Sequence, residues 1–181
     1  NQRLTAVASI AKAVTSTLNL DDIFQIIVNQ SREFVEFSSA TLALIDAQEP
    51  FIDLFTLLLD RKSTPQFRHR IPSGLPFFAE LFERRRAVVV SDAAERIPAA
   101  DSGLVLCEGV NSFVFVPLLV KNRLVGAMLF GSKSETAYHH QEVQLLSLMA
   151  DQIAVAVDNA RLLDLEQHRS RQLELINSIG K

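Results

Sequence analysis

Two apolar runs on either side of a short polar pair mark the second half of the chain. Residues 111–120 and 123–132 are rich in Val, Phe and Leu, and Lys121 and Asn122 separate them. Asparagine tolerates the left-handed backbone that a tight turn needs, so the pattern predicts a β-hairpin. Because Pro117 lacks a backbone donor, its strand is expected to pair weakly there or to lie beside a β-bulge.

A long helix is predicted to follow the hairpin, from Gln141 to Leu163. Its apolar residues recur every three or four positions, so they share one face that must be buried. They are Leu145, Leu146, Met149, Ile153, Ala156, Val157 and Ala160. A hairpin followed directly by a helix that packs on its sheet indicates an α+β domain.

Two amphipathic helices are predicted at the start of the chain. The apolar face of the first consists of Leu4, Val7, Ala8, Ala11, Val14 and Leu18. Asn19, with Asp22 three residues later, is typical of the start of a second helix. This helix has Ile23, Ile27, Phe34 and Val35 on its apolar side and is expected to end near Phe37.

The middle of the chain predicts further strands and one short helix. The strands are expected at residues 39–46, 51–60, 67–71 and 87–90, and the helix at about 76–86. Pro76 suits the first turn of a helix, where its missing N–H would be unpaired anyway. The stretch from Ser91 to Gly109 is weakly patterned, which is typical of functional or mobile insertions. Short connections favour antiparallel pairing of the strands.

Composition narrows the class of protein. The chain has 181 residues, of which 48% are apolar, and this is enough for one domain with extensions. Its net charge of -3 gives no electrostatic footprint for nucleic acid, and no apolar run is long enough to span a membrane. The single cysteine, Cys107, fits a reducing compartment, so a cytoplasmic protein is expected. Since the chain begins at Asn1 without a methionine, we expect it to be a segment of a longer protein.

The chain resembles the GAF family of small-molecule sensor domains over nearly its whole length, from Ala13 to Leu163. The segments that carry the resemblance, in this order and spacing, are residues 88–92, 115–118, 124–127 and 150–160. The resemblance implies a profilin-like or PAS-like α+β fold with a central antiparallel sheet of about five to six strands. The terminal helices would pack on one face, and the excursion from Phe67 to Gly109 would close over a pocket on the other. On this basis residues 1–163 are predicted to form the sensor domain and residues 164–181 a helical linker.

Aromatic residues concentrate around the implied pocket. The predicted ligand contacts are Phe67, Arg70, Phe77, Phe78, Asp92, Cys107, Phe113 and Phe115. A mostly apolar cavity with a few polar anchors is typical of small-ligand sites, and Arg70 and Asp92 are the expected anchors. The alternative is that these phenylalanines, together with Phe82, simply fill the space between the short helix and the sheet.

Several specific chemistries are disfavoured. No Ser-His-Asp or Cys-His order stands out, so enzymatic activity is not expected. Relatives that attach a bilin usually have a histidine after the cysteine, where this chain has Glu108, and relatives that reduce methionine sulfoxide need more than one cysteine. The Asn-Lys…Phe…Asp-Glu signature of cyclic-nucleotide-binding relatives is not found. An iron site made of Cys107, Asp92 and Asp101 is a further alternative, although a buried structural thiol is the default interpretation.

The end of the chain offers a second function. The apolar stripe of the long helix continues through Leu162, Leu163, Leu165, Leu175, Ile176 and Ile179. A helix that has run past its own sheet needs another helix to cover such a stripe, which predicts a parallel homodimer through the N- and C-terminal helices. The alternative is a frayed tail. Residues 173–181 also resemble residues 4–12, either by chance or because a second copy of the domain begins there.

These features together predict a non-catalytic sensory domain of a bacterial signalling protein. It would bind an unidentified small molecule and control an effector in the same chain. The resemblance suggests a histidine kinase of a two-component system, a cyclic-dinucleotide enzyme or a phosphatase as that effector. The alternatives are a ligand-free dimerisation spacer and an iron- or haem-based gas or redox sensor.

Overall fold

The computed structural model describes residues 4–5, 8–9, 12–13, 17, 19–59, 66–96 and 109–180, without the side chains of residues 66, 67 and 94. Four helices and six strands have defined bounds within these residues. In chain order they are α2 (Leu20–Ser31), β1 (Ser39–Ile45), β2 (Phe51–Leu58), β3 (Gln66–Pro72), α3 (Pro76–Arg84), β4 (Val88–Ser91), α4 (Ala93–Arg96), β5 (Ser112–Val120), β6 (Arg123–Ser132) and α5 (His140–Ile179). Most of the first predicted helix lies outside the described residues.

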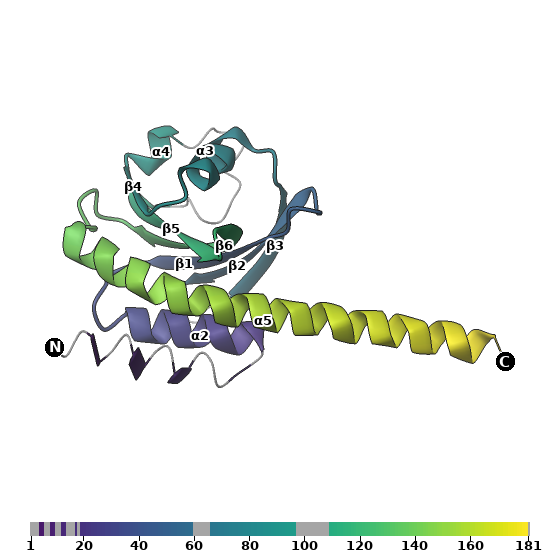
Figure 1. Cartoon of the computed structure of the whole chain (residues 1–181). Helices are drawn as coiled ribbons and strands as arrows, with labels where there is room; N and C mark the ends of the chain where they lie inside the picture. Colours follow the sequence, from purple (N-terminus) through teal and green to yellow (C-terminus); the bar gives the residue numbers. More distant parts are fainter. Residues whose placement is uncertain are drawn as a thin grey trace.

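The strands form one antiparallel sheet with the order β3-β2-β1-β6-β5-β4. Helices α2 and α5 cover one face, and α3 and α4 lie over the other, as Figure 1 shows. The predicted α+β architecture with six antiparallel strands is therefore confirmed. We call the first face the helix face and the second the α3 face.

Helix α2 begins as predicted and ends earlier. The Asn19 side chain accepts hydrogen bonds from the backbone N–H groups of Asp21 (2.9 Å) and Asp22 (3.4 Å), which caps the first turn. The helix ends at Ser31 rather than near Phe37. Its end is tightened because Phe34 N–H donates to Ser31 O, three residues back, in the turn that leads to β1.

The β5–β6 hairpin has the predicted two-residue turn. Lys121 and Asn122 both have positive φ values, 47° and 63°, as a type I′ turn requires. The register then shifts from the pair Leu118–Gly126 to the pair Leu119–Leu124, so that Val125 has no partner. This bulge lies next to Pro117, as expected from the sequence.

The bulge decides where the residues near the turn point, because an extra residue reverses the alternation of side chains along a strand. On β6, Ala127 packs in the core of the α3 face, whereas Val125 packs in the core of the helix face. Arg123, two residues before Val125, consequently also lies on the helix face.

The sheet is apolar on both faces. The core of the helix face joins α2 and α5 to alternate strand residues such as Leu42, Val114 and Phe130. The core of the α3 face includes Ile52, Leu54 and Phe115. The strands are therefore buried on both sides, and each face needs its own cover.

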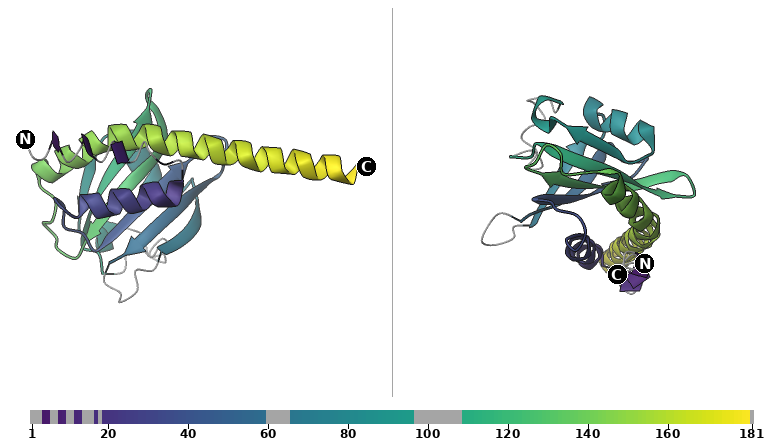
Figure 2. Two further views of the ribbon diagram at one scale, coloured as in Figure 1. Left: turned by 90° about the horizontal axis from the view of Figure 1, so that it is seen from below. Right: turned by 90° about the vertical axis from the view of Figure 1, so that its left-hand side faces the viewer.

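Helix α5 has 40 residues and continues without a break past Leu163. Its side chains are buried mainly between Leu146 and Ala160, and from Asp164 onward every described residue is exposed. Figures 1 and 2 show this last part extending beyond the sheet. Within the described part of the chain, we find no helix with the length and apolar character required to cross a membrane.

Gly126 should be sensitive to substitution because β1 passes very close to it. A Cβ atom at this position would lie 2.4 Å from the carbonyl oxygen of Ala43, where backbone rather than a flexible side chain must give way. We expect Gly126→Ala to lower the free energy of unfolding by roughly 1–3 kcal/mol in urea denaturation. Gly74→Ala is the matched control, since nothing lies within 4 Å of its added Cβ, and an equal loss in both variants would contradict this packing argument.

Tyr138 should make the fold sensitive to alkali. Its hydroxyl is buried and has no hydrogen-bond partner among the described residues, and burial, with a smaller effect of the Glu36 charge, raises the pKa of the phenol. The unfolded chain thus loses this proton at a lower pH than the folded chain, so stability should fall as pH rises above about 10. Urea denaturation between pH 8 and 11 should show a shallower fall for Tyr138→Phe, and parallel curves would refute this role.

Candidate functional site

Helix α3 covers the α3 face of the sheet. Pro76 occupies its first turn, and Phe78 and Leu81 point into the core. The helix ends at Arg84, and the next residue, Arg85, has a φ of 48° in the left-handed region, which turns the chain toward β4.

Five phenylalanines pack together between α3 and the sheet and form what we call the aromatic cluster. They are Phe77, Phe78 and Phe82 of α3 and Phe113 and Phe115 of β5. The ring centroids of Phe77 and Phe113 lie 5.8 Å apart, and those of Phe82 and Phe115 lie 5.6 Å apart. These distances are typical of favourable aromatic pairs. The structure thus brings four of the eight predicted contacts together and adds Phe82.

The rings of the cluster pack closely against one another. Phe78, Phe113 and Phe115 are 3%, 5% and 0% exposed, so their rings are part of the core. A hollow of about 110 Å³ lies beside the cluster, between α3, β4 and α4. Its lining consists of Phe77, Glu80, Leu81, Arg84, Val88, Val90 and Arg96. Pockets for drug-sized ligands are larger, at roughly 300–1,000 Å³.

Asp92 lies where β4 passes into α4. It has a φ of 57°, and its carbonyl oxygen accepts hydrogen bonds from the backbone N–H groups of Glu95 (3.0 Å) and Arg96 (3.2 Å). Its side chain is exposed. The residue therefore shapes the start of α4, and a contact between its carboxylate and a ligand remains a prediction.

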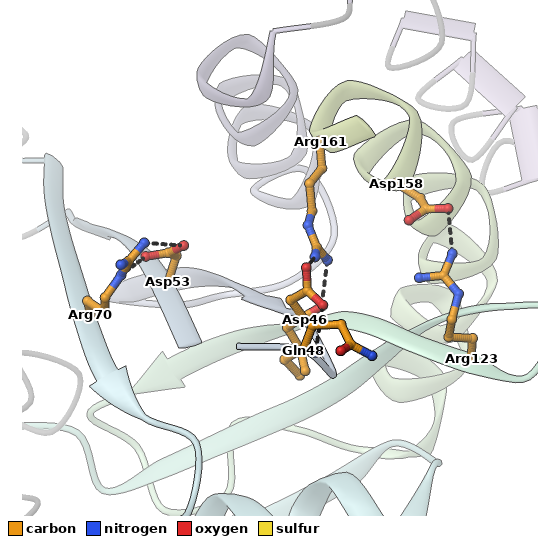
Figure 3. A network of polar contacts seen from close by, with 8 residues as sticks. Asp46, Gln48, Asp53, Arg70, Arg123, Asp158 and Arg161 are labelled. Carbon is orange, nitrogen blue, oxygen red and sulfur yellow. Dashed lines mark hydrogen bonds and ion pairs between the residues drawn. The ribbon is translucent and has the colours of Figure 1, made fainter. Parts of the chain in front are cut away.

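Arg70 does not join the aromatic cluster. In the register of β2 and β3 it pairs with Asp53, one position from Ile52 and Ile71 of the α3 face, so its side chain lies on the opposite face of the sheet. Its Nε donates to Asp53 Oδ1 at 2.8 Å, a contact visible in Figure 3, and this hydrogen bond raises the pKa of the guanidinium. Both side chains are largely solvent-exposed.

The two remaining predicted contacts cannot be placed. Cys107 lies outside the described residues, and of Phe67 only the backbone, in β3, is described. The alternative iron site cannot be placed either, because Cys107 and Asp101 are both outside the described ranges. Among the described residues there is no group of three or more His, Cys, Asp or Glu side chains that could hold a metal ion.

Two ion pairs that the sequence did not reveal fasten α5 to the sheet (Figure 3). Arg123 Nη2, beside the hairpin turn, donates to Asp158 Oδ2 at 2.9 Å. Arg161 pairs with Asp46 after β1 and donates to the carbonyl oxygen of Ile45 at 2.6 Å. The side chain of Asp158 is only 11% exposed, so removing Arg123 would leave a nearly buried carboxylate without its ion-pair partner. Both pairs lie just before α5 leaves the sheet.

A polar groove of about 550 Å³ on the helix face was also not predicted. It runs between the start of α2, the side chain of Arg68 on β3 and the part of α5 near Asp164. Arg68 lies over the ring of Phe55, with its guanidinium carbon 4.4 Å from the ring centroid, and thus closes one side of the groove.

The family model for the GAF domain matches residues 17–158. This chain belongs to the GAF family. The resemblance implied this layout, in which helices near the ends of the chain cover one face of the sheet and the excursion lies over the other.

Known relatives show what kinds of protein contain this domain. The chain is 26% identical to the DNA-binding transcriptional activator HyfR of Escherichia coli, over 96% of the chain and 28% of HyfR. It therefore spans less than a third of the length of that regulator.

Solved structures show the same fold at lower identity. The GAF domain of a phosphoenolpyruvate-protein phosphotransferase from Acinetobacter superimposes with a TM-score of 0.70 at 18% identity, covering 90% of this chain and 96% of that domain. Free methionine-R-sulfoxide reductase from Neisseria meningitidis, solved with its substrate, gives 0.65 at 16% identity, covering 89% and 91%. The fold thus occurs in proteins of different function, so it does not decide the function of this chain.

Proposed function

We propose that this chain is a non-catalytic sensory domain whose output element is α5. The observation that carries the proposal is that one helix both seals the sheet and leaves it. Residues between Leu146 and Ala160 hold α5 on the helix face, and the segment beyond Asp164 is free to contact another helix. A change in how the sheet supports α5 would therefore reach whatever follows the domain.

The second step of the proposal is homodimerisation through α5. Leu148, Val155 and Leu162 recur every seven residues and are 48%, 46% and 51% exposed. Ile176 belongs to the same series, which Arg169 interrupts, and Leu165 and Ile179 belong to a second series, which is offset by three residues and interrupted by Gln172. Two interleaved seven-residue series are typical of a helix that pairs with another helix. The terminal helix of a second copy is the occupant we propose for this stripe.

The proposed ligand site is the α3 face, with the aromatic cluster as its apolar wall. The hollow that the described residues form there has a volume of about 110 Å³, so a ligand held by these residues alone either has few heavy atoms or displaces α3 to make room. Contacts from Phe67, Asp92 and Cys107 remain predictions. Arg70 lies on the other face of the sheet and pairs with Asp53, so it is not part of this site.

We further propose that the domain belongs to a larger cytoplasmic signalling protein. Because the chain covers 28% of HyfR, we add the transcriptional activators to the effector classes expected from the sequence, which are histidine kinases, cyclic-dinucleotide enzymes and phosphatases. Residues 164–181 would then connect the sensor domain, residues 1–163, to the next domain, with α5 continuing as far as Ile179.

A ligand-free dimerisation spacer is the second candidate function. The close packing of the aromatic cluster favours it, because rings already occupy the space beneath α3. In that case α5 would supply the only function of the domain.

Thermal unfolding with a panel of small molecules separates the two functions. A real ligand raises the melting temperature by mass action, by an amount that grows with its concentration. Any compound that stabilises the native chain should lose this effect in Phe77→Ala, which removes one wall of the hollow. Phe51→Ala is the control, because Phe51 is 42% exposed and does not line the hollow. If no nucleotide, tetrapyrrole, metal ion, organic acid or small aromatic compound responds, the spacer is favoured.

Light scattering of the purified chain tests the dimer. We expect a dimer for the native sequence, and a monomer when Leu162→Glu and Ile176→Glu are combined, because they place charge within the apolar stripe. Gln167→Glu adds charge to a different side of the same helix and should leave the dimer intact. A native chain that stays monomeric at high concentration would refute this part of the proposal.

A further inference from the structure

The end of the β5–β6 hairpin is held from both faces of the sheet. On the α3 face, Arg85 at the end of α3 donates through Nη1 to the carbonyl oxygen of Asn122, and the same nitrogen lies 3.3 Å from Asn122 Oδ1. The neighbouring residue, Arg123, binds Asp158 of α5 on the helix face at 2.9 Å (Figure 3). Asn122 in the turn and Arg123 at the start of β6 thus contact residues that lie on opposite faces of the sheet. Asn122 contacts Arg85 directly after α3, and Arg123 contacts Asp158 in α5.

We propose that this turn links α3 mechanically to α5 around the end of the sheet. A movement of α3 would displace Arg85, pull on the peptide of Asn122, and shift Arg123 against Asp158. The inference goes beyond the proposed sensor function, because the link is a property of the chain and needs no ligand.

Three features make the turn suited to this role. First, the bulge at Val125 turns Arg123 toward α5, whereas strict alternation with Ala127 would place it on the α3 face. Second, Arg85, Lys121 and Asn122 all adopt the left-handed conformation, so the contact joins two segments with sharply defined backbones. Third, Asp158 is nearly buried, so losing Arg123 would leave a carboxylate without its partner.

The link differs from a route through the strands. Phe113 and Phe115 of the aromatic cluster alternate along β5 with Val114 and Val116, which pack in the core of the helix face. A displacement transmitted by that packing would not depend on Arg85 or Arg123. Substitution of these two side chains therefore distinguishes the routes.

Hydrogen exchange of backbone amides, measured by mass spectrometry on the whole chain, tests the proposal. Arg85→Ala should speed exchange in the turn and in α5 near Asp158 by roughly two- to tenfold. Arg84→Ala is the matched control, because Arg84 is adjacent but pairs with Glu80 within α3 at 2.7 Å, and it should leave α5 unchanged.

The reverse direction supplies the second half of the test. Arg123→Ala should speed exchange in α3 by a similar factor, whereas Arg161→Ala, which releases the other anchor of α5, should not. Confinement of the Arg85→Ala effect to α3, or unaltered α3 exchange in Arg123→Ala, would overturn the proposal. A uniform rise over β1 and β2 as well would also overturn it, because it would indicate global destabilisation rather than a local link.

Discussion

Burial of both faces of the sheet is the constraint on which the structure depends. Every residue of β5 from Ser112 to Leu118 is buried, so neither face of this strand can be left to solvent. Apolar surface that is withheld from water stabilises the fold in proportion to its area, and helices on both sides are needed to withhold it. Helices α2 and α5 cover one face, and α3 with the aromatic cluster covers the other.

The local elements of this fold could be predicted from short sequence patterns. The pairings between residues that are far apart in the sequence could not. The hairpin, its turn, the bulge beside Pro117 and the start of α2 follow from short segments whose chemistry decides their own conformation. The face of Arg70 could have been inferred from the alternation around Ile71, but that needs the register with β2. The two anchors of α5 join residues 35 and 115 positions apart, and nothing local identifies either partner.

The aromatic cluster shows why the ligand is the hardest part to obtain from sequence. Phenylalanines packed against one another and phenylalanines that line a pocket follow the same apolar pattern, since both need a buried position on a strand or helix. The ring contacts between α3 and β5 show that these phenylalanines pack against one another, which the sequence pattern does not reveal.

The length of α5 would enlarge any small rotation of the helix at the sheet. At a rise of about 1.5 Å per residue, the helix is about 60 Å long, and about 27 Å of it lies beyond Arg161. Pivoting there by about 5° would carry the far tip through roughly 2 Å, comparable to the helix shifts by which many proteins switch state. A rotation of α5 about the ion pair between Arg161 and Asp46 would therefore displace the far end of the helix more than the part on the sheet.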